Sequence, residues 1–385
     1  MDKLSFIELF SGAGGFSASL DSLFSPITAI DNDSRAREVY TRNHTNVNFF
    51  QEDVTKIRDF RTIIKGTPDI LLAGPPCQGF SFVGMKTKKK LSLLKDYNST
   101  TDPKNRLPLE IPRATSKLRP SLIIMENVPA MKNQMISQDG NLLKVTDLLK
   151  EQLEEQGYFV SEPFILNSYD IGIAQRRKRT FVVASIETQI NLNDINKIQR
   201  KAKEQCECKN LDQTILDLAS IPASTRKNRI DPSFPDHVTR LPNDDDLKII
   251  RNLRQGENYA SLIDRMPEVL EGRKHKVYKT SSFKDKFYRL SWEQPSRTIV
   301  AHLQKDGNSF IHPSQNRSIS VREAARIQTF PDYFSFNIPM SPAYRLVGNA
   351  VPPQMGKFLV EIFARMVGFL NEKNANNMEF AGLVT

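Results

Sequence analysis

The chain has few cysteines, and this scarcity limits the classes of protein to which it can belong. Three of its 385 residues are cysteine, and two of these, Cys206 and Cys208, stand together in a charged segment. A sparse, odd-numbered set does not form the disulfide framework of a secreted domain, so we expect a reducing, cytoplasmic compartment. A single C-x-C without further spaced ligands is a poor zinc site, and we expect no bound metal.

Long apolar runs are also missing. No window approaches the roughly 18 consecutive apolar residues that a membrane-spanning helix needs. The first ten residues, MDKLSFIELF, have too short an apolar part for a signal peptide and read as a first strand. The five histidines offer no evident base for a thiol protease. Since 39% of the residues are hydrophobic, we expect a globular protein that does not enter a membrane.

Positive charge exceeds negative charge along the chain. Lys and Arg number 54 against 44 Asp and Glu, which gives a formal net charge of +10. Such a balance favours a polyanionic partner, because cations that neutralise phosphates release counterions. Basic enzymes also act on small anionic substrates, so the charge alone leaves a nucleic-acid partner open.

The first half of the chain contains short apolar runs that have the composition of strands buried on both faces. They span 4–10, 26–31, 69–74, 121–127 and 179–185. Between the first two runs, Phe16, Leu20, Leu23 and Phe24 recur at helical spacing, which predicts a strand–helix–strand unit of a doubly wound sheet. Ligands of such sheets bind beyond the carboxyl ends of the strands.

After about residue 190 this alternation stops. Polar, charged and proline-rich segments follow, and a periodic apolar helix returns only in the segment 353–370. We expect the middle region to form a second domain or a large insertion. The last helix should fold back onto the sheet of the first domain.

A glycine-rich turn, FSGAGGFS, follows the first predicted strand. Gly12, Gly14 and Gly15 would let the backbone approach a ligand closely, although a plain tight turn is the alternative. The pattern is not G-x-G-x-x-G, which argues against a dinucleotide oxidoreductase. Asp31 could accept hydrogen bonds from a ribose and Asp53 could suit an adenine amino group, although a lone carboxylate is more often a cap.

Cys77 follows Pro75 and Pro76 at the end of an apolar run. Proline fixes its own φ and restricts the residue before it, so the direction of the thiol is set in advance. A thiol with a pKa of about 8.5 is a few per cent ionised at neutral pH and is already a good nucleophile. Cys77 is therefore either a nucleophile or an inert cysteine.

Two further polar groups stand at strand ends. Glu126 closes a very apolar strand, so its carboxyl should be partly desolvated, with a raised pKa, and could donate a proton; a helix cap is the alternative. In QRRKR, alternation along a strand would place Arg177 and Arg179 on one face. There they could clamp a phosphate or polarise a carbonyl, instead of forming a solvated basic patch.

Taken in order, these motifs resemble the cytosine-C5 DNA methyltransferases of prokaryotic restriction–modification systems. The match comprises FIELFSGAGGFS, the strand-end Asp31, DILLAGPPCQGFSF, MENV, QRRKR, VREAARIQTFPD and GNAVPP. The resemblance implies the class I S-adenosylmethionine-dependent methyltransferase fold, an α/β fold with a doubly wound, mostly parallel seven-stranded sheet. It implies a catalytic domain at 1–188 plus 337–385 and a smaller DNA target recognition domain at 189–336.

The resemblance also implies roles for individual residues. Cys77 would add to C6 of a flipped cytosine, Glu126 and Asn127 would engage the base, and Arg177 and Arg179 would support the base and the nucleophile, with Arg177 polarising O2. The residues implied around S-adenosyl-L-methionine, which leaves as S-adenosyl-L-homocysteine, are Phe10, Gly12, Gly14, Asp31, Asp53, Val54, Gly74, Asn349 and Ala350. The implied DNA contacts are Gln78, Ser81, Lys86, Lys88, Arg229 and Arg240.

Double-stranded DNA is the partner that follows from this resemblance, and a cognate restriction endonuclease would act on the same site. We expect a monomer. The alternatives are an RNA (tRNA) cytosine-C5 methyltransferase and a non-catalytic methyltransferase-like DNA-binding protein. The long middle segment argues against the first, and the complete set of Cys77, Glu126 and Arg177 argues against the second. In the middle segment we expect Arg322 and Arg326 to organise the domain instead of reading bases.

Overall fold

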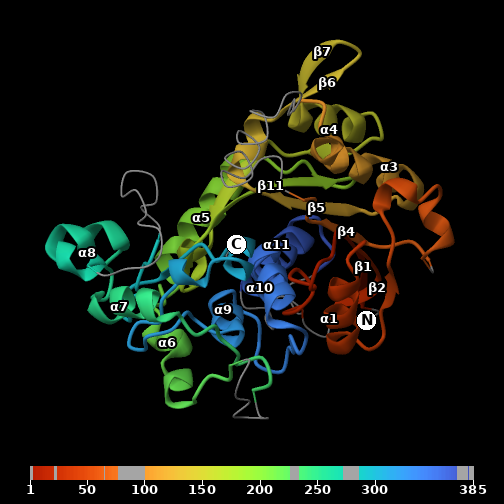
Figure 1. Ribbon diagram of the computed structural model, residues 1–385. Coiled ribbons are helices and arrows are strands. Elements are labelled where there is room, and N and C mark those ends of the chain that lie inside the picture. Colours follow the sequence, from red (N-terminus) through yellow and green to blue (C-terminus); the bar gives the residue numbers. More distant parts are fainter. Residues whose placement is uncertain are drawn as a thin grey trace. The chain divides into compact units, whose positions relative to one another are not determined.

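The computed structural model of the chain describes residues 3–20, 24–64, 66–76, 100–225, 234–271, 286–370 and 380. The chain divides into two compact units, whose elements are labelled in Figure 1. Unit 1 comprises Met1–Ile171, Lys178–Cys206 and Val351–Thr385, and unit 2 comprises Gly172–Arg177 and Glu207–Ala350.

Unit 1 is built around an eight-stranded sheet with the order β3-β2-β1-β4-β5-β11-β8, in which β9 also pairs with β11. The strands that run parallel to one another are β1 (Leu4–Leu9), β2 (Phe24–Ile30), β3 (Asn48–Phe50), β4 (Ile70–Ala73) and β5 (Leu122–Asn127). The antiparallel part consists of β11 (Lys178–Ser185), β8 (Phe159–Val160) and β9 (Phe164–Asn167). The predicted doubly wound, mostly parallel sheet is confirmed. Its strands number eight instead of seven because two short strands pair with different parts of β11.

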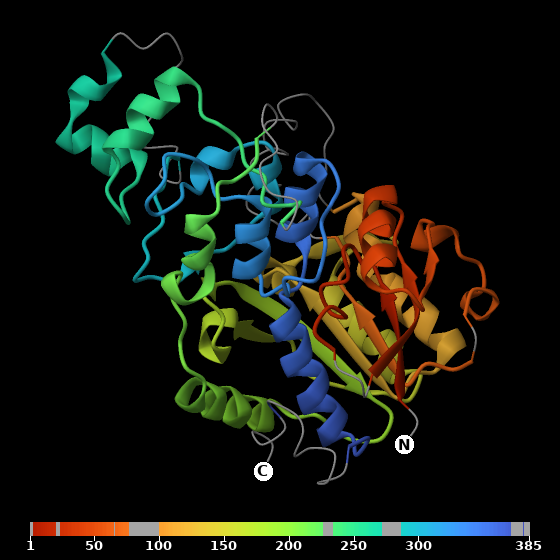
Figure 2. The ribbon, with the colours of Figure 1, turned by 90° about the horizontal axis from the view of Figure 1, so that it is seen from below.

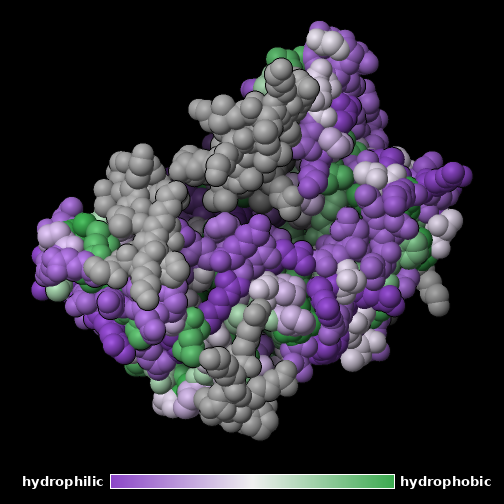
Figure 3. All heavy atoms as spheres, viewed as in Figure 1, coloured by the Kyte–Doolittle hydropathy of each residue, from purple (hydrophilic) through white to green (hydrophobic). Residues whose placement is uncertain are grey.

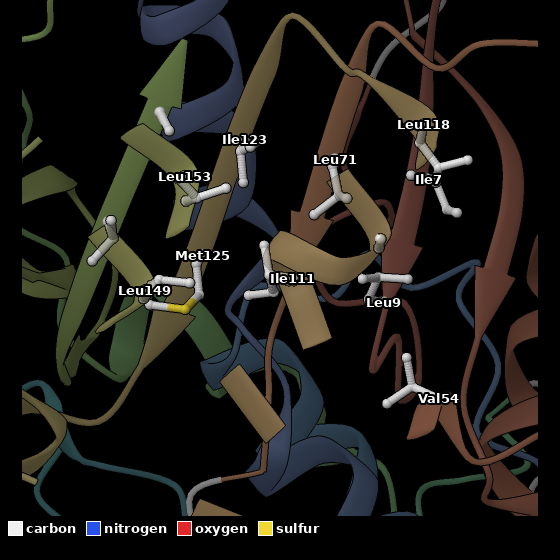
Figure 4. Close-up of a cluster of buried hydrophobic side chains, with 14 of the residues drawn as sticks. Ile7, Leu9, Val54, Leu71, Ile111, Leu118, Ile123, Met125, Leu149 and Leu153 are labelled. Atoms are coloured by element: carbon white, nitrogen blue, oxygen red, sulfur yellow. The ribbon is translucent and has the colours of Figure 1, made fainter. Parts of the chain in front are cut away.

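Helices cover this sheet on both faces, which explains why β4 and β5 are buried along their whole length. On one face, α3 (Glu110–Leu118) and α4 (Val145–Glu154) enclose a hydrophobic cluster with alternate strand residues such as Ile7, Leu71 and Ile123 (Figure 4). Burial of each such side chain contributes about 1.5–3 kcal/mol. Their neighbours along each strand point to the other face, because side chains alternate.

The last helix, α11 (Pro353–Met366), packs on unit 1 as predicted and contacts β5 (Figure 2). Phe363 of this helix lies 6.0 Å from the ring of Phe164 in β9. Gly356 approaches the backbone of Phe16 so closely that a Cβ there would lie 3.0 Å from Phe16 Cα. The apolar periodicity of the segment therefore predicts the helix that packs on the sheet.

The prediction of a helix directly after the first strand is wrong. Residues 12–19 form consecutive turns, and Phe24 begins β2 instead of continuing a helix. Gly12 and Gly14 have φ values of 54° and 85°, which an α-helix cannot accommodate. The helical spacing of the apolar residues is outweighed by these two left-handed positions.

Short elements complete unit 1. They are α1 (Ser34–Asn43), η1 (Val54–Lys56), η2 (Phe60–Thr62), η3 (Pro103–Leu109), η4 (Pro129–Asn133), the hairpin of β6 (Met135–Gln138) and β7 (Asn141–Lys144), η5 (Ser168–Ile171) and α5 (Leu192–Gln205).

Unit 2 consists mainly of short helices. They are α6 (Asp212–Ile215), η6 (Asp217–Ser220), α7 (Asp244–Asn252), α8 (Tyr259–Arg265), η7 (Pro267–Leu270), η8 (Ala301–Gln304), η9 (Gly307–Ser309), α9 (Val321–Ile327) and α10 (Met340–Asn349), with the paired strands β10 (Gln175–Arg176) and β12 (Ser296–Arg297). A capping box starts α9, because Glu323 N donates to Ser320 Oγ and Ser320 N donates to the Glu323 carboxylate.

The arginines of α9 organise unit 2, as the sequence predicts. Arg322 is 2% exposed, and its Nε donates to Asp236 Oδ1 at 2.9 Å. Arg326 bridges Asp217 and Asp332, with nitrogen–oxygen distances of 2.6 and 2.7 Å. Both guanidinium groups therefore hold segments of this unit together.

The compact units divide the chain at residues other than those predicted for the functional domains. Helix α5 belongs to unit 1, where Gln199 Nε2 donates to Ile165 O at 3.2 Å. Helix α10 belongs to unit 2 and packs on η8. The assignment of DNA recognition to 189–336 concerns function, and it stays a prediction.

No helix among the described residues is long and apolar enough to cross a membrane. The described part of the face drawn in Figure 3 is mostly hydrophilic. Large exposed apolar side chains, among them Leu142, Leu241 and Tyr333, come from separate elements and loops.

Candidate active site at the carboxyl ends of the strands

The glycine-rich turn after β1 is held at the end of β2. Phe10, Gly12 and Gly14 all have positive φ, so the chain reverses sharply there. Ser11 N donates to Ile30 O at 3.0 Å, and Gly12 N donates to Asp31 Oδ2 at 2.8 Å. The turn is therefore fixed to the residues that leave β2.

Asp31 stands where the sequence predicts a group that binds ribose. Its second oxygen, Oδ1, accepts from Asp33 N at 2.9 Å, so backbone donors engage both carboxylate oxygens. These backbone donors fix the orientation of the carboxylate beside the glycine turn.

Asp53 caps a short helix, which is the alternative that the sequence left open for this carboxylate. It caps η1, because its Oδ1 accepts from Thr55 N at 3.0 Å and from Thr55 Oγ1 at 2.8 Å. Val54 beside it is 4% exposed and packs in the cluster of Figure 4. A contact of either residue with a cofactor stays a prediction.

The end of β4 meets both the glycine turn and Glu126. Gly74 N donates to Leu9 O at 3.3 Å. A Cβ on Gly74 would lie 3.9 Å from Phe10 O and 4.0 Å from Glu126 Oε2. Gly74 is thus the point where three strand ends come together. Residues 77–99, which follow, lie outside the described residues. They include Cys77 and the predicted DNA contacts Gln78, Ser81, Lys86 and Lys88. The predicted DNA contact Arg229 also lies outside the described residues.

Asn127 fixes the backbone that leads to Cys77. Its Nδ2 donates to Pro75 O at 3.2 Å, its Oδ1 accepts from Val128 N at 2.8 Å, and the residue is 1% exposed. A buried amide that is held in this way orients the chain two residues before the cysteine. This contact indicates a positioning role for Asn127.

Glu126 and Arg179 form an ion pair at the same sheet edge. Arg179 Nε lies 2.8 Å from Glu126 Oε1, and the two side chains are 12% and 9% exposed. They meet because β11 runs antiparallel to β5, with Phe181 opposite Glu126, so the start of β11 lies at the carboxyl end of β5. Low exposure strengthens the attraction and makes the loss of either partner costly.

Arg177 lies just before β11 and not within it, so the shared strand face with Arg179 stays a prediction. Arg177 falls in the break between β10 and β11, where the alternation of a continuous strand does not apply. It belongs to unit 2 and is 1% exposed. Its guanidinium donates to Ile299 O at 2.6 Å, Gly348 O at 3.1 Å and Ala350 O at 2.9 Å.

The other predicted residues of unit 2 have contacts within that unit. Asn349 ends α10, and Ala350 follows it with its carbonyl bound by Arg177. Arg240, a predicted DNA contact, donates to Gln304 O and, at 3.1 Å, to Ser341 Oγ. Cofactor and DNA binding by these residues stay predictions.

Glu8 is a buried polar residue that none of the sequence motifs indicates as functional. This carboxylate lies in β1 at 2% exposure and accepts from Tyr40 Oη at 3.0 Å. Burial raises its pKa from 4.5 to about 7. The signal in the sequence is a lone acidic residue inside the apolar run of the first strand.

The glycine turn fits the adenosyl cofactor that the resemblance implies. Ser11 Oγ is buried and has no hydrogen-bond partner among the residues that the structure describes, which leaves a polar group for a ligand. In the described part of the chain, the position of a Cβ on Gly12 has no atom within 4 Å, so these residues leave this side of the turn open. Among the described residues, no group of three or more His, Cys, Asp or Glu side chains could hold a metal ion.

Comparisons with known proteins identify the family and the fold. The family model described as C-5 cytosine-specific DNA methylase matches residues 4–364. The chain is 27% identical to the Type II methyltransferase M.AgeI of Thalassovita gelatinovora, over 92% of this chain and 98% of that protein. It is 28% identical to the Type II methyltransferase M.DdeI of Desulfomicrobium norvegicum, over 99% and 93%. The crystal structure of the S. pombe Dnmt2 methyltransferase has a similar fold, with a TM-score of 0.60 at 16% identity, over 95% of this chain and 100% of that one.

Proposed function

Because the chain belongs to the C-5 cytosine-specific DNA methylases and is therefore a DNA cytosine-C5 methyltransferase, we propose that it is a sequence-specific Type II modification enzyme. Its substrate is double-stranded DNA, from which it flips one cytosine. The observation that carries the proposal is the meeting of Glu126, Arg179, Asn127 and the backbone of Pro75 at one sheet edge. The names of the similar proteins support the Type II assignment.

Cys77 is the nucleophile in this proposal. Cytosine C5 is a poor nucleophile, but addition of the Cys77 thiolate to C6 gives an enamine whose C5 can attack an electrophilic methyl group. S-adenosyl-L-methionine supplies that methyl group and leaves as S-adenosyl-L-homocysteine. A base then removes the C5 proton, the sulfur–C6 bond breaks, and the Cys77 thiolate is restored. The bond from Asn127 to Pro75 supports this role, because it fixes the backbone that precedes the thiol.

Glu126 and Arg179 stabilise the charge that develops on the base. The Glu126 carboxyl holds or shares a proton at N3, where thiolate addition creates negative charge. Arg179, which is paired with Glu126, would polarise O2. We assign this task to Arg179 instead of Arg177, whose guanidinium binds three backbone carbonyls of unit 2. Arg177 is then a positioning residue for Gly348 and Ala350.

The cofactor site combines the glycine turn with the neighbouring strand ends. Its residues in unit 1 are Phe10, Gly12, Gly14, Asp31, Asp53, Val54 and Gly74. The resemblance also implies cofactor contacts by Asn349 and Ala350, which belong to unit 2. The buried Ser11 hydroxyl joins this set. Asp31 would accept hydrogen bonds from the ribose, and the glycines let the backbone approach the ligand.

The region 189–336 is proposed to read the DNA sequence, with Arg229 and Arg240 among its phosphate or base contacts. The lysines that follow Cys77 and the residues Gln78 and Ser81 would contact the strand near the flipped base. A cognate endonuclease would cut the same site when it is unmethylated. The enzyme is proposed to act as a cytoplasmic monomer.

Bisulfite sequencing of a plasmid from a host that expresses the gene tests the proposal. We expect full protection of cytosines at one position of one recognition site, and no protection with the Cys77→Ser variant. Protection that is equal in both strains, or absent in both although the wild-type protein is folded and abundant, would contradict the proposed function. Methyl transfer to tRNA but not to duplex DNA would also contradict it.

A further inference from the structure

Glu8 anchors the glycine turn to the sheet. It projects from β1 to the face opposite Ile7 and Leu9, which belong to the cluster of Figure 4. The Phe16 amide and the Ser17 hydroxyl, which belong to the turn, lower the pKa of its carboxyl as nearby donors, and the Ser17 hydroxyl also donates to Gly14 O at 3.2 Å. It also accepts from the Tyr40 hydroxyl at 3.0 Å. One side chain thus ties β1, the turn segment and α1 together.

Tyr40 forms the floor under the turn. It is fully buried, and a Cβ on Gly14 would lie 2.9 Å from Tyr40 Cε2. Its ring lies 4.5 Å from that of His44 and 5.4 Å from that of Phe49. The ring therefore limits how closely the backbone at Gly14 can approach α1. The Tyr40 hydroxyl donates to Glu8.

The ionisable groups that face Glu8 come from β2 and α1. Asp31 follows β2 and acts on Glu8 through its charge, and Tyr40 of α1 donates to it. His44, the C-cap of α1, contacts the Tyr40 ring and the Ser17 hydroxyl. Burial raises the pKa of Glu8 to about 7, lowers that of His44 to about 4, and raises that of Tyr40 well above 10. Of Glu8, His44 and Tyr40, only Glu8 therefore changes charge near neutral pH.

We propose that Glu8 and Tyr40 are a positioning pair which holds the glycine turn in the form that binds S-adenosylmethionine, and that the charge on Glu8 adjusts the affinity for this cofactor. The inference rests on the proposed cofactor site. A carboxylate only accepts, which matches the Tyr40 hydroxyl and the other donors near Glu8, whereas a protonated carboxyl adds a donor to a place already supplied with donors. The negative charge also favours a ligand that carries a sulfonium cation.

Binding of S-adenosylmethionine to the full chain without DNA, measured by calorimetry from about pH 6 to about pH 8, tests the inference across the pKa of Glu8. We expect the wild type to bind more tightly as pH rises. Glu8→Gln should bind about 10-fold more weakly at the upper pH, as expected for the loss of one hydrogen bond to a charged group, and its profile should be flatter. Comparison of the two profiles removes the titration of the ligand itself.

Tyr40→Phe provides a second, independent readout. It keeps the ring under Gly14 but removes a donor that lowers the pKa of Glu8. The midpoint of the pH profile should therefore move to higher pH. A purely structural role would change the melting temperature without moving this midpoint.

Glu361→Gln is the matched control, since Glu361 is also fully buried in unit 1 and accepts from Phe380 N at 3.0 Å. Its affinity profile should follow the wild type. Identical profiles for wild type and Glu8→Gln, with an unmoved midpoint in Tyr40→Phe, would overturn the inference while leaving the cofactor site intact. A folded wild type that does not bind the cofactor at any pH would overturn the proposed cofactor site as well.

Discussion

Arg179 Nε lies 2.8 Å from Glu126 Oε1, and this pair joins the start of β11 to the carboxyl end of β5. Two oppositely charged groups are thereby held with little exposure at the edge where Gly74 leads toward Cys77. In the proposed mechanism, the pair would supply both a carboxyl group and a planar donor for one flipped base. Its geometry gives the first prediction.

Arg179→Lys keeps the positive charge but loses the planar fork of donors. We expect kcat for DNA methylation to fall by about 10²–10³-fold, as for the loss of one preorganised donor to developing charge. Steady-state kinetics measure this. Lys178→Ala changes the exposed cation next in sequence and should retain activity. Equal losses in both variants would show that general charge, not the pair with Glu126, matters.

Asn127→Ala removes the donor to Pro75 O. Since the backbone before Cys77 loses its anchor, we expect the rate of covalent adduct formation with DNA to fall about 10-fold or more, which corresponds to at least about 1.4 kcal/mol. The affinity for S-adenosylmethionine should change little. The measurement is single-turnover kinetics beside calorimetry. A variant that loses cofactor affinity but keeps its adduct rate would contradict this role.

Arg177→Lys distinguishes the structural role of Arg177 from the role that the sequence suggests. Three backbone carbonyls of unit 2 would lose guanidinium donors, so we expect the free energy of unfolding to fall by about 2–4 kcal/mol in urea denaturation. A direct contact with cytosine O2 predicts the opposite pattern, in which stability is unchanged and kcat collapses. That outcome would restore the assignment from the motif.

The stability of the protein should depend on pH through His312. Burial lowers its pKa to about 4, and its Nδ1 accepts from Gln315 N at 3.0 Å, so the folded state keeps it neutral. In the unfolded chain it takes up a proton near its ordinary value of 6.5. Between these values the unfolded state binds more protons, so stability falls as pH drops from about 6.5 to about 4, by up to about 3 kcal/mol.

His312→Asn isolates this contribution, because the amide oxygen can replace the Nδ1 acceptor without titrating. Urea denaturation across that interval should show a shallower dependence on pH for the variant than for the wild type. Parallel curves would mean that His312 does not contribute. Other histidines with lowered pKa values, such as His44 and His237, titrate in both proteins and cancel in the comparison.

Much of the fold follows from local patterns. The runs of apolar residues identify β1, β2, β4, β5 and β11, because strands buried on both faces need no polar residues. The strand-end rule also places Asp31, Gly74 and Glu126 at one edge. The pattern cannot show that left-handed glycines replace a helix after β1, since apolar spacing does not record φ.

Contacts between residues far apart in the sequence also limit how well the site can be predicted. Arg177 and Arg179 look equivalent in QRRKR, but a strand break sends them to different units. Nor does the sequence reveal that Glu8 meets Tyr40, because their contact joins β1 to a helix that follows β2. Such contacts depend on the register of packed elements and not on motifs.

The central claim is that Cys77 attacks a flipped cytosine in DNA, and covalent trapping tests it most directly. The purified chain is incubated with S-adenosylmethionine and duplex DNA that carries 5-fluorocytosine at the methylated position found by bisulfite sequencing. Fluorine blocks the loss of a proton from C5, so the sulfur–C6 bond should persist. We predict an adduct that survives denaturation, with the DNA attached at Cys77, and none with Cys77→Ser. No adduct from a folded, cofactor-binding wild type, or attachment at another residue, would contradict the account.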